Sequence, residues 1–521
     1  MDSKQFQEAA ISSIEEIVKY YDNIEDRRVL PTVEPGYLRK LLPADAPEEG
    51  EPWADIQKDI EDKIMPGITH WQSPNFLAWF PSSGSFPAML GEMYSAAFTG
   101  AAFNWVCSPA VTELETVVLD WLARGLALPP CYHSAGPTAG GGVIHGTASE
   151  AVATVMVAAR EAYLRAATAG LALEEGGDAL EDALAERRAR LVALAGAAAH
   201  SATRKAAQIA GVRFRAVPSR PGDGHRLTGA ALREAIAGLR ARGLEPFYVT
   251  ATFGTTDTCA IDDMDGIAAA VADADADEAS TGGGKIWVHV DAAYAGAALL
   301  CGEYRALAGT SLERFHSFNT NLHKWLLVNF DCSALWVRDR HLLTSALSVG
   351  GAASLAILAN RHSDSGLVTD YRDWQIPFGR RFRSLKVWFV LRSYGLAGLR
   401  AHVRRHVALA EAFAAAMRAR NDLFEIVTGP RFALTVFALK GKGGGKEKGE
   451  AAALEAQNAL TKRLYDDVVA GGKMFLSSTV VGGVFAIRHN PATPRVEERH
   501  VRKHFEILVE AAENVLAAEG A

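Results

Sequence analysis

The middle of the chain alternates short, mostly apolar runs with longer helical patterns. Four runs are rich in β-branched or aromatic residues and cover 191–195, 247–252, 286–290 and 333–337. Because they are apolar almost throughout instead of alternating with polar residues, we expect strands that are covered on both faces, as in a mainly parallel sheet. Residues 86–380 are therefore predicted to form a large α/β domain.

The two ends of the chain follow other patterns. Residues 1–85 predict helical segments that several prolines interrupt, with aromatic residues near their end. This N-terminal arm has too few apolar residues for its own core, so we expect it to pack on another surface, with a second copy of the chain as the candidate. Residues 381–521 predict a smaller α+β domain. Its expected elements are helices near 381–420, 451–470 and 496–517, and strands at 432–437 and 483–487.

Composition narrows the class of protein. A length of 521 residues allows two or three domains at roughly 150 residues each. The net charge of −7 offers no basic surface to nucleic acid or to an anionic membrane. The N-terminus lacks a signal-peptide pattern, and no apolar run reaches the roughly 20 residues of a transmembrane helix. We therefore expect a cytoplasmic enzyme.

The five cysteines are far apart and form no CxxC pair. This spacing predicts buried free thiols, and neither disulfides nor a metal site. His402 and His406 lie four residues apart on a predicted helix without the neighbouring glutamate of a zinc motif, so we interpret them as a solvated helix face.

Candidate chemistry begins with Asp291, which follows the strand predicted at 286–290. A lone Asp at a strand end is more often a helix cap, but His323 and Lys324 occur about thirty residues downstream, between polar residues and an apolar run. A lysine in a largely apolar site can form an imine with an aldehyde. Pyridoxal 5'-phosphate (PLP) needs such a lysine and also an acid for its pyridine nitrogen, because a protonated ring is the better electron sink. Lys324 and Asp291 are the two candidates.

A phosphate site is predicted where the Gly-rich segment 140–146 leads into a helix expected over 147–165. Free N–H groups and the helix dipole favour an anion at such a helix start. No Gly-Lys-Ser/Thr follows, so this is not a nucleotide-binding P-loop. Taken alone, a Gly-rich turn is more often a simple connection.

Taken together in order, these motifs resemble those of group II PLP-dependent decarboxylases, specifically the aromatic-L-amino-acid decarboxylase branch. The resemblance extends over roughly residues 60–400, and the C-terminal part matches more loosely. The matching stretches are 69–81, 108–115, 140–150, 251–256, 289–296, 321–332, 370–377 and 379–385.

The resemblance implies PLP fold type I (aspartate aminotransferase-like) and a homodimer with its active site at the interface. It implies that Lys324 holds PLP as a Schiff base and that Asp291 binds the pyridine nitrogen. His200 is expected to stack on the ring and assist the chemistry. The remaining cofactor contacts it implies are Thr252 beside the ring oxygen, Ala293 on the ring, and Ala148, Ser149 and Asn321 at the phosphate.

The resemblance also implies a substrate site with His323 next to the Schiff-base lysine. The pocket for the aromatic side chain is expected to contain Trp71, Phe80, Ser82 and Phe103. The expected reaction is decarboxylation of an aromatic L-amino acid (phenylalanine, tyrosine, dopa or tryptophan) to the arylalkylamine and CO2. No metal is implied.

Two positions depart from the family pattern. The expected mobile loop, 341–365, contains no tyrosine, and either Ala353 or Ile357 falls where relatives carry the tyrosine that protonates the product. Loss of that phenol is a feature of aromatic aldehyde synthases, which release aldehyde, ammonia and hydrogen peroxide. Val484 stands where relatives usually carry an arginine, and Arg488 is a candidate substitute.

Three other functions compete with an amine-forming decarboxylase. The aldehyde synthase shares the decarboxylation step and differs in its product. A non-catalytic PLP-fold binding subunit is disfavoured because Lys324, Asp291 and His200 are all present. An aminotransferase has the same fold, but the motifs match the decarboxylase branch.

Overall fold

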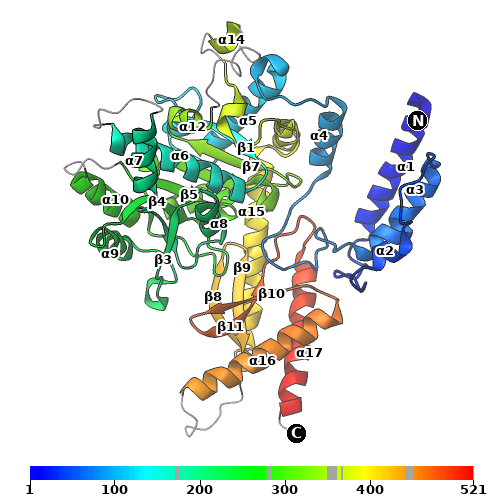
Figure 1. Ribbon diagram of the computed structural model, residues 1–521. Helices are drawn as coiled ribbons and strands as arrows, with labels where there is room; N and C mark the ends of the chain where they lie inside the picture. Colours follow the sequence, from blue (N-terminus) through cyan, green and yellow to red (C-terminus); the bar gives the residue numbers. More distant parts are fainter. Residues whose placement is uncertain (170–176, 279–283, 349–360, 365–367, 442–449, 520–521) are drawn as a thin grey trace. The chain divides into compact units, whose positions relative to one another are not determined.

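The structure is a computed structural model that describes residues 1–169, 177–278, 284–348, 361–364, 368–441 and 450–519 (Figure 1). The chain divides into two compact units. One consists of residues 82–408, and the other combines residues 1–81 with 409–521. The N-terminal arm thus belongs to the same unit as the C-terminal part of the chain. Among the described residues, no helix is both long enough and apolar enough to cross a membrane.

The larger unit is built on a seven-stranded sheet with the order β1-β7-β6-β5-β4-β2-β3. The strand β7 is antiparallel to both of its neighbours, and the other adjacent strands pair in parallel. The expected mainly parallel sheet is therefore confirmed. The strands are β1 (Gly141–His145), β2 (Leu191–Gly196), β3 (Arg213–Val217), β4 (Glu245–Thr252), β5 (Trp287–Asp291), β6 (Ser317–Asn321) and β7 (Ser333–Val337).

Helices cover this sheet, and six of its strands are almost entirely buried, whereas the edge strand β3 is mostly exposed (Figure 1). The helix α6 (Ala148–Thr168) packs on the central strands and on two neighbouring helices, α8 (Ala202–Ile209) and α12 (Arg340–Leu347). Its fully buried residues include Val152, Val155 and Met156. The other helices of this unit include α4 (Phe86–Ala97), α5 (Pro109–Gly125), α7 (Asp178–Arg188), α9 (Gly229–Arg240) and α10 (Met264–Glu278).

The second unit contains a four-stranded antiparallel sheet with the order β10-β11-β9-β8. Its strands are β8 (Phe424–Arg431), β9 (Leu434–Leu439), β10 (Ser477–Val481) and β11 (Val484–His489). The predicted C-terminal helices are present: α16 (Glu450–Gly471) and α17 (Glu498–Glu519) belong to this unit, whereas α15 (Arg383–Ala419) begins in the larger unit and only its end belongs to this one. The N-terminal arm contributes α1 (Ser3–Asp22), α2 (Tyr37–Leu41) and α3 (Trp53–Asp59), and Phe76 forms a β-bridge with Phe475.

Candidate active site

The candidate active site lies at the edge of the large sheet where its parallel strands end. In register, Thr252 at the end of β4 is opposite Asp291 at the end of β5, and Asp291 is opposite Asn319 in β6. Both Asn321 in β6 and His145 in β1 pair with Ser333 of the antiparallel strand β7. The ends of β1, β4, β5 and β6 therefore share one edge, which is where open α/β sheets bind ligands.

Asp291 is buried at this edge and held by the chain that follows it. Its Oδ1 accepts the N–H of Ala293 at 3.0 Å, and the carbonyl of Ala293 accepts the N–H of Asn321, also at 3.0 Å. These two bonds connect the segment after β5 to the end of β6. The structure thus places Asp291, Ala293 and Asn321 together at this edge.

Lys324 lies in α11 (Leu322–Trp325), a single turn that starts directly after β6. The segment around Ser83 holds this turn from outside. The Ser83 hydroxyl donates to the carbonyl of Lys324, and the Ser83 N–H donates to the carbonyl of His323 at 2.7 Å. Ser85 Oγ donates to the carbonyl of Leu327 at 2.7 Å. Ser82, predicted to line the substrate pocket, is therefore next to a residue that contacts the Lys324 turn.

A stack of aromatic rings also supports the turn that carries Lys324. Trp325 is parallel to Tyr294, with ring centroids 4.7 Å apart and an interplanar angle of 11°. The indole N–H of Trp325 donates to Nδ1 of His406 at 2.9 Å. The expectation that His402 and His406 form a solvated helix face is wrong, because both are buried and their rings lie 4.3 Å apart. Their spacing places them on one face of α15, but spacing alone does not tell a buried face from an exposed one.

His200 follows β2 and is electrostatically linked to both candidate residues. Its Nδ1 accepts the N–H of Ala202 at 3.1 Å. Partial desolvation lowers the pKa of His200, the Asp291 carboxylate opposes this shift, and the charge of Lys324 reinforces it. The structure thus places His200 within electrostatic reach of Asp291 and Lys324, as a ring-stacking role requires.

The start of α6 is where the sequence predicts a phosphate site. The cap residue Thr147 accepts the N–H of Glu150 at 3.3 Å, and Ser149 is exposed in the first turn. The N-terminus of this 21-residue helix lies at the same sheet edge as Asn321, so its free N–H groups can bind an anion there. The Gly-rich segment predicted as a turn is mostly the buried strand β1, and Gly146 and Thr147 connect this strand to the helix.

Two buried polar atoms at this edge test whether a cofactor fits. Within the described part of the chain, Thr252 Oγ1 and Asn321 Oδ1 are buried and have no hydrogen-bond partner. Leaving such atoms unpaired is costly unless a ligand or water satisfies them. Both belong to residues that were expected to contact PLP. The Thr252 hydroxyl can donate to a ring oxygen, and the Asn321 side chain offers an amide N–H2 that can donate to a phosphate, so these residues fit this cofactor.

The remaining predicted pocket residues are less directly connected to Lys324. The ring of Phe103 packs on that of Phe378, with ring centroids 4.6 Å apart. Trp71 and Phe80 belong to the other unit, where Trp71 stacks on Phe76 at 4.4 Å. There Arg488, the candidate substitute for the arginine missing at 484, lies over the Phe80 ring at 5.2 Å and donates to Ser477 Oγ at 2.7 Å. Their roles in substrate binding stay predictions.

The structure also bears on the missing tyrosine. Ala353 and Ile357 lie outside the described residues. Tyr371, the tyrosine that follows the expected loop in sequence, is buried, and its hydroxyl donates to the carbonyl of Gly142 at 3.1 Å. Burial raises the pKa of Tyr371 far above its ordinary value. Tyr371 is therefore a structural residue and does not replace the missing phenol.

The cysteines were predicted to be buried free thiols. Four of the five are buried, and Cys107 is exposed.

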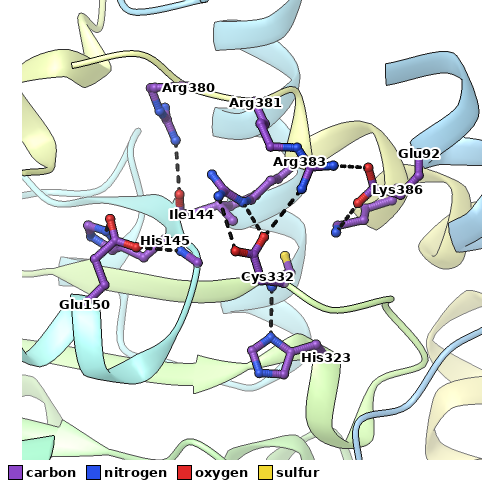
Figure 2. A network of polar contacts seen from close by, with 12 residues as sticks. Glu92, Ile144, His145, Glu150, His323, Cys332, Arg380, Arg381, Arg383 and Lys386 are labelled. Carbon is purple, nitrogen blue, oxygen red and sulfur yellow. Dashed lines mark hydrogen bonds and ion pairs between the residues drawn. The ribbon is translucent and has the colours of Figure 1, made fainter. Parts of the chain in front are cut away.

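Sequence reasoning missed the charged residues that support the site. Arg383 binds Asp331, the residue before Cys332, and has a smaller electrostatic effect on Glu150. Figure 2 labels Arg383, Glu150 and His323. Arg383 and Asp331 are 52 residues apart in sequence, so no local spacing reveals their contact. Both occur within stretches that the family resemblance covers, and this was the only signal that marked them.

Comparison with known proteins agrees with this geometry. Residues 35–440 match the pyridoxal-dependent decarboxylase conserved domain. Aromatic-L-amino-acid decarboxylase of Rattus norvegicus is 42% identical over 520 residues, which cover 100% of both chains. Phenylacetaldehyde synthase of Arabidopsis thaliana is also 42% identical, over 99% of this chain and 97% of that protein. A crystal structure of Oryza sativa TDC with PLP and tryptamine superimposes with a TM-score of 0.89 at 37% identity, covering 99% of each chain.

The matches cover nearly the whole chain, and the relatives' fold confirms the expected fold class. The same matches identify the enzyme as a carboxy-lyase that uses PLP, which is the cofactor that the unpaired polar atoms at the sheet edge fit. The chain belongs to the pyridoxal-dependent decarboxylase family, among the aromatic-L-amino-acid decarboxylases and related aromatic aldehyde synthases.

Proposed function

We propose that this enzyme decarboxylates an aromatic L-amino acid of the phenylalanine, tyrosine, dopa or tryptophan class. The observation that carries the proposal is the meeting of Lys324, Asp291 and His200 at one edge of the large sheet. The substrate class is supported by 42% identity to aromatic-L-amino-acid decarboxylase over the full length. When bound, PLP supplies the electron sink that takes up the electron pair left by the departing carboxylate.

Each predicted residue has a task that its position supports. Lys324 would bind the cofactor covalently, and the Ser83 contact together with the Trp325 stack holds the turn that carries it. The buried Asp291 carboxylate would keep the pyridine nitrogen protonated. His200 and Ala293 would contact the two faces of the ring. Phosphate contacts would come from the start of α6 (Ala148 and Ser149) and from Asn321, and Thr252 Oγ1 would donate to the ring oxygen.

The substrate would lie beside His323 and Ser82, with the aromatic side chain near Phe103, Trp71 and Phe80. Burial and the charge of Lys324 lower the pKa of His323 to about 3, so the ring stays neutral at physiological pH. A neutral histidine next to the catalytic lysine adds no second positive charge beside the protonated pyridine ring of the cofactor. It still offers an N–H to the bound amino acid.

The product depends on how the substrate carbon is protonated after CO2 leaves. The arylalkylamine is our first proposal, because the family's ring-stacking histidine, His200, is present. A specific observation favours a second candidate: residues 341–365 contain no tyrosine, and Tyr371 is committed to Gly142. An aldehyde synthase would then consume O2 and water and release CO2, aldehyde, ammonia and hydrogen peroxide. Full-length similarity to phenylacetaldehyde synthase supports this second candidate.

Product analysis on the substrate panel tests both proposals. The enzyme is incubated with each of the four amino acids, and CO2, amine, aldehyde and peroxide are measured. CO2 with an equal amount of amine supports the decarboxylase, whereas peroxide and aldehyde equal to CO2 support the synthase. Ile357→Tyr and Ala353→Tyr restore a phenol at the two possible positions and are expected to shift a peroxide-forming enzyme toward amine. The absence of CO2 from all four substrates would contradict the proposed function.

We also propose that the enzyme is a homodimer. On α4, the exposed apolar residues Phe86, Leu90, Met93 and Tyr94 recur at helical spacing and form one stripe. On α1 of the N-terminal arm, Phe6, Ile14 and Ile17 are also exposed. Exposed apolar stripes of this kind mark protein–protein contacts. Sedimentation equilibrium should give twice the 55.8 kDa chain mass, and Leu90→Glu should weaken the dimer more than Val480→Glu, which alters an exposed valine outside the stripe.

A further inference from the structure

A network of charged side chains lies behind His323 (Figure 2). At its centre, the Arg383 guanidinium binds the Asp331 carboxylate, with Nε 2.9 Å from Oδ1 and Nη2 3.4 Å from Oδ2. Burial raises the pKa of Asp331, but the bond and charge of Arg383, together with the smaller effects of Lys386 and Arg381, hold the pKa below its usual value. Asp331 is therefore a carboxylate at neutral pH, and Arg383 fixes its place.

The residue after Asp331 connects the network to the candidate site. The Cys332 N–H donates to Nδ1 of His323 at 2.8 Å. The Cys332 carbonyl accepts the N–H groups of Leu322 at 3.0 Å and of His323 at 3.4 Å. The backbone of Cys332 thus binds both the start of α11 and the imidazole ring, and its position follows directly from that of Asp331.

This contact determines how His323 can act. The bond from Cys332 occupies the lone pair of Nδ1, so the neutral ring carries its hydrogen on Nε2. In this form, Nε2 donates a hydrogen bond and does not accept one. Taking up a second proton on Nδ1 would break the Cys332 bond. The pKa of the ring is low mainly because of burial and the charge of Lys324, so the ring stays neutral.

The other side of Arg383 faces the phosphate-binding turn. Burial raises the pKa of Glu150, but hydrogen bonds from His145 and Gly146 and the charge of His145 lower it, and the net shift is downward. The positive charge of Arg383 adds a smaller lowering effect. Glu150 accepts the N–H of Gly146 at 2.9 Å and contacts Nδ1 of His145 at 3.2 Å. A Cβ at Gly146 would lie 2.8 Å from Asp331 Oδ2, so the carboxylate packs directly on this turn.

We propose that Arg383 is a positioning residue for His323. By holding Asp331, Arg383 keeps the Cys332 N–H hydrogen-bonded to Nδ1 of His323. The Nε2–H of His323 is then the group that donates a hydrogen bond to the bound amino acid. The acceptor is an oxygen or another lone-pair atom of the substrate. This inference rests on the proposed function for the identity of the ligand, but the state of the His323 ring is a property of the protein alone.

The ring state is measured by NMR of the full-length enzyme with 15N-labelled histidine, both without and with bound cofactor. Comparison with His323→Asn identifies the signals of His323. In the parent enzyme, His323 is expected as the neutral Nε2–H form at pH 7. In Arg383→Gln, this form is expected to give way to a mixture of both tautomers. Arg383→Lys keeps the charge but not the two-point contact, and should restore the ring state in part.

Arg381→Gln is the matched control. Arg381 Nη1 lies 3.7 Å from Asp331 Oδ1, too far for a hydrogen bond, and its side chain is half exposed. This variant should leave the His323 tautomer unchanged. Kinetically, Arg383→Gln should lower kcat/KM about tenfold, roughly the loss of one hydrogen bond to the substrate, with KM changing more than kcat. Arg381→Gln should not show this split.

An unchanged Nε2–H tautomer in folded Arg383→Gln would overturn the inference, even if activity fell. If Arg383→Gln does not fold, Asp331→Asn replaces it, because it keeps the side-chain volume but loses the charge that binds Arg383. A tautomer mixture in Asp331→Asn supports the inference, and a pure Nε2–H form overturns it. Failure of the proposed function would appear separately, as an absence of CO2 release by the parent enzyme.

Discussion

Lys324→Ala is expected to abolish decarboxylation, with a loss of roughly 10⁴-fold or more, the scale seen when a covalently acting residue is removed from its catalytic group. The cofactor would lose its covalent attachment to the protein, and the absorbance band of that attachment would disappear. The fold should survive, because the turn is held through the carbonyl of Lys324 and through the Trp325 ring, and neither contact uses the lysine side chain.

The assignment of the lysine can be tested directly by chemical trapping. Reduction of the loaded enzyme with borohydride followed by peptide mapping should place PLP on Lys324. Lys205→Ala is a suitable control, since this exposed lysine on α8 has no expected role. Labelling of another lysine in the parent enzyme, or full activity of Lys324→Ala, would contradict the assignment.

Much of the fold was predictable because long apolar runs leave few alternatives. All four strands predicted in the large domain exist, and β7 begins and ends at the predicted residues, 333 and 337. The strand β6 was missed because its sequence, Ser-Phe-Asn-Thr-Asn, is mostly polar although the strand is fully buried. Two of its polar side chains are paired inside the sheet: Ser317 Oγ accepts the indole N–H of Trp287 at 2.8 Å, and Asn319 Oδ1 contacts His289 Nε2 at 3.0 Å. No hydrophobic pattern could reveal such a strand.

The candidate site was predictable to the extent that its residues follow strands. Asp291, Thr252 and Asn321 all end strands, and sheet register alone brings them to one edge. The supporting residues were not predictable, because they approach from distant elements. His406 reaches Trp325 from α15, and the register of a helix face on a strand end is set by packing of the whole unit. For the same reason, burial of His402 could not be read from its spacing.

Asp291→Asn is the second substitution with a large expected effect. Asparagine keeps an oxygen that can accept the Ala293 N–H, so the segment after β5 should keep its conformation. What is lost is the negative charge facing the cofactor position. We expect kcat to fall roughly 10²–10³-fold, the scale for removing one preorganised electrostatic group from an active site. Cofactor content, measured from the absorbance spectrum, should fall much less than kcat.

The electrostatic link to His200 provides an independent readout of the same substitution. Because the Asp291 carboxylate raises the pKa of His200, its removal should lower that pKa further, leaving His200 neutral over a wider range on the acidic side. Asp257 also raises the pKa of His200 but has no expected contact with the cofactor. Asp257→Asn should therefore shift the His200 titration in the same direction while kcat stays close to that of the parent enzyme. If both variants lost kcat equally, the effect would come from the protonation of His200, and Asp291 would have no separate role at the pyridine nitrogen.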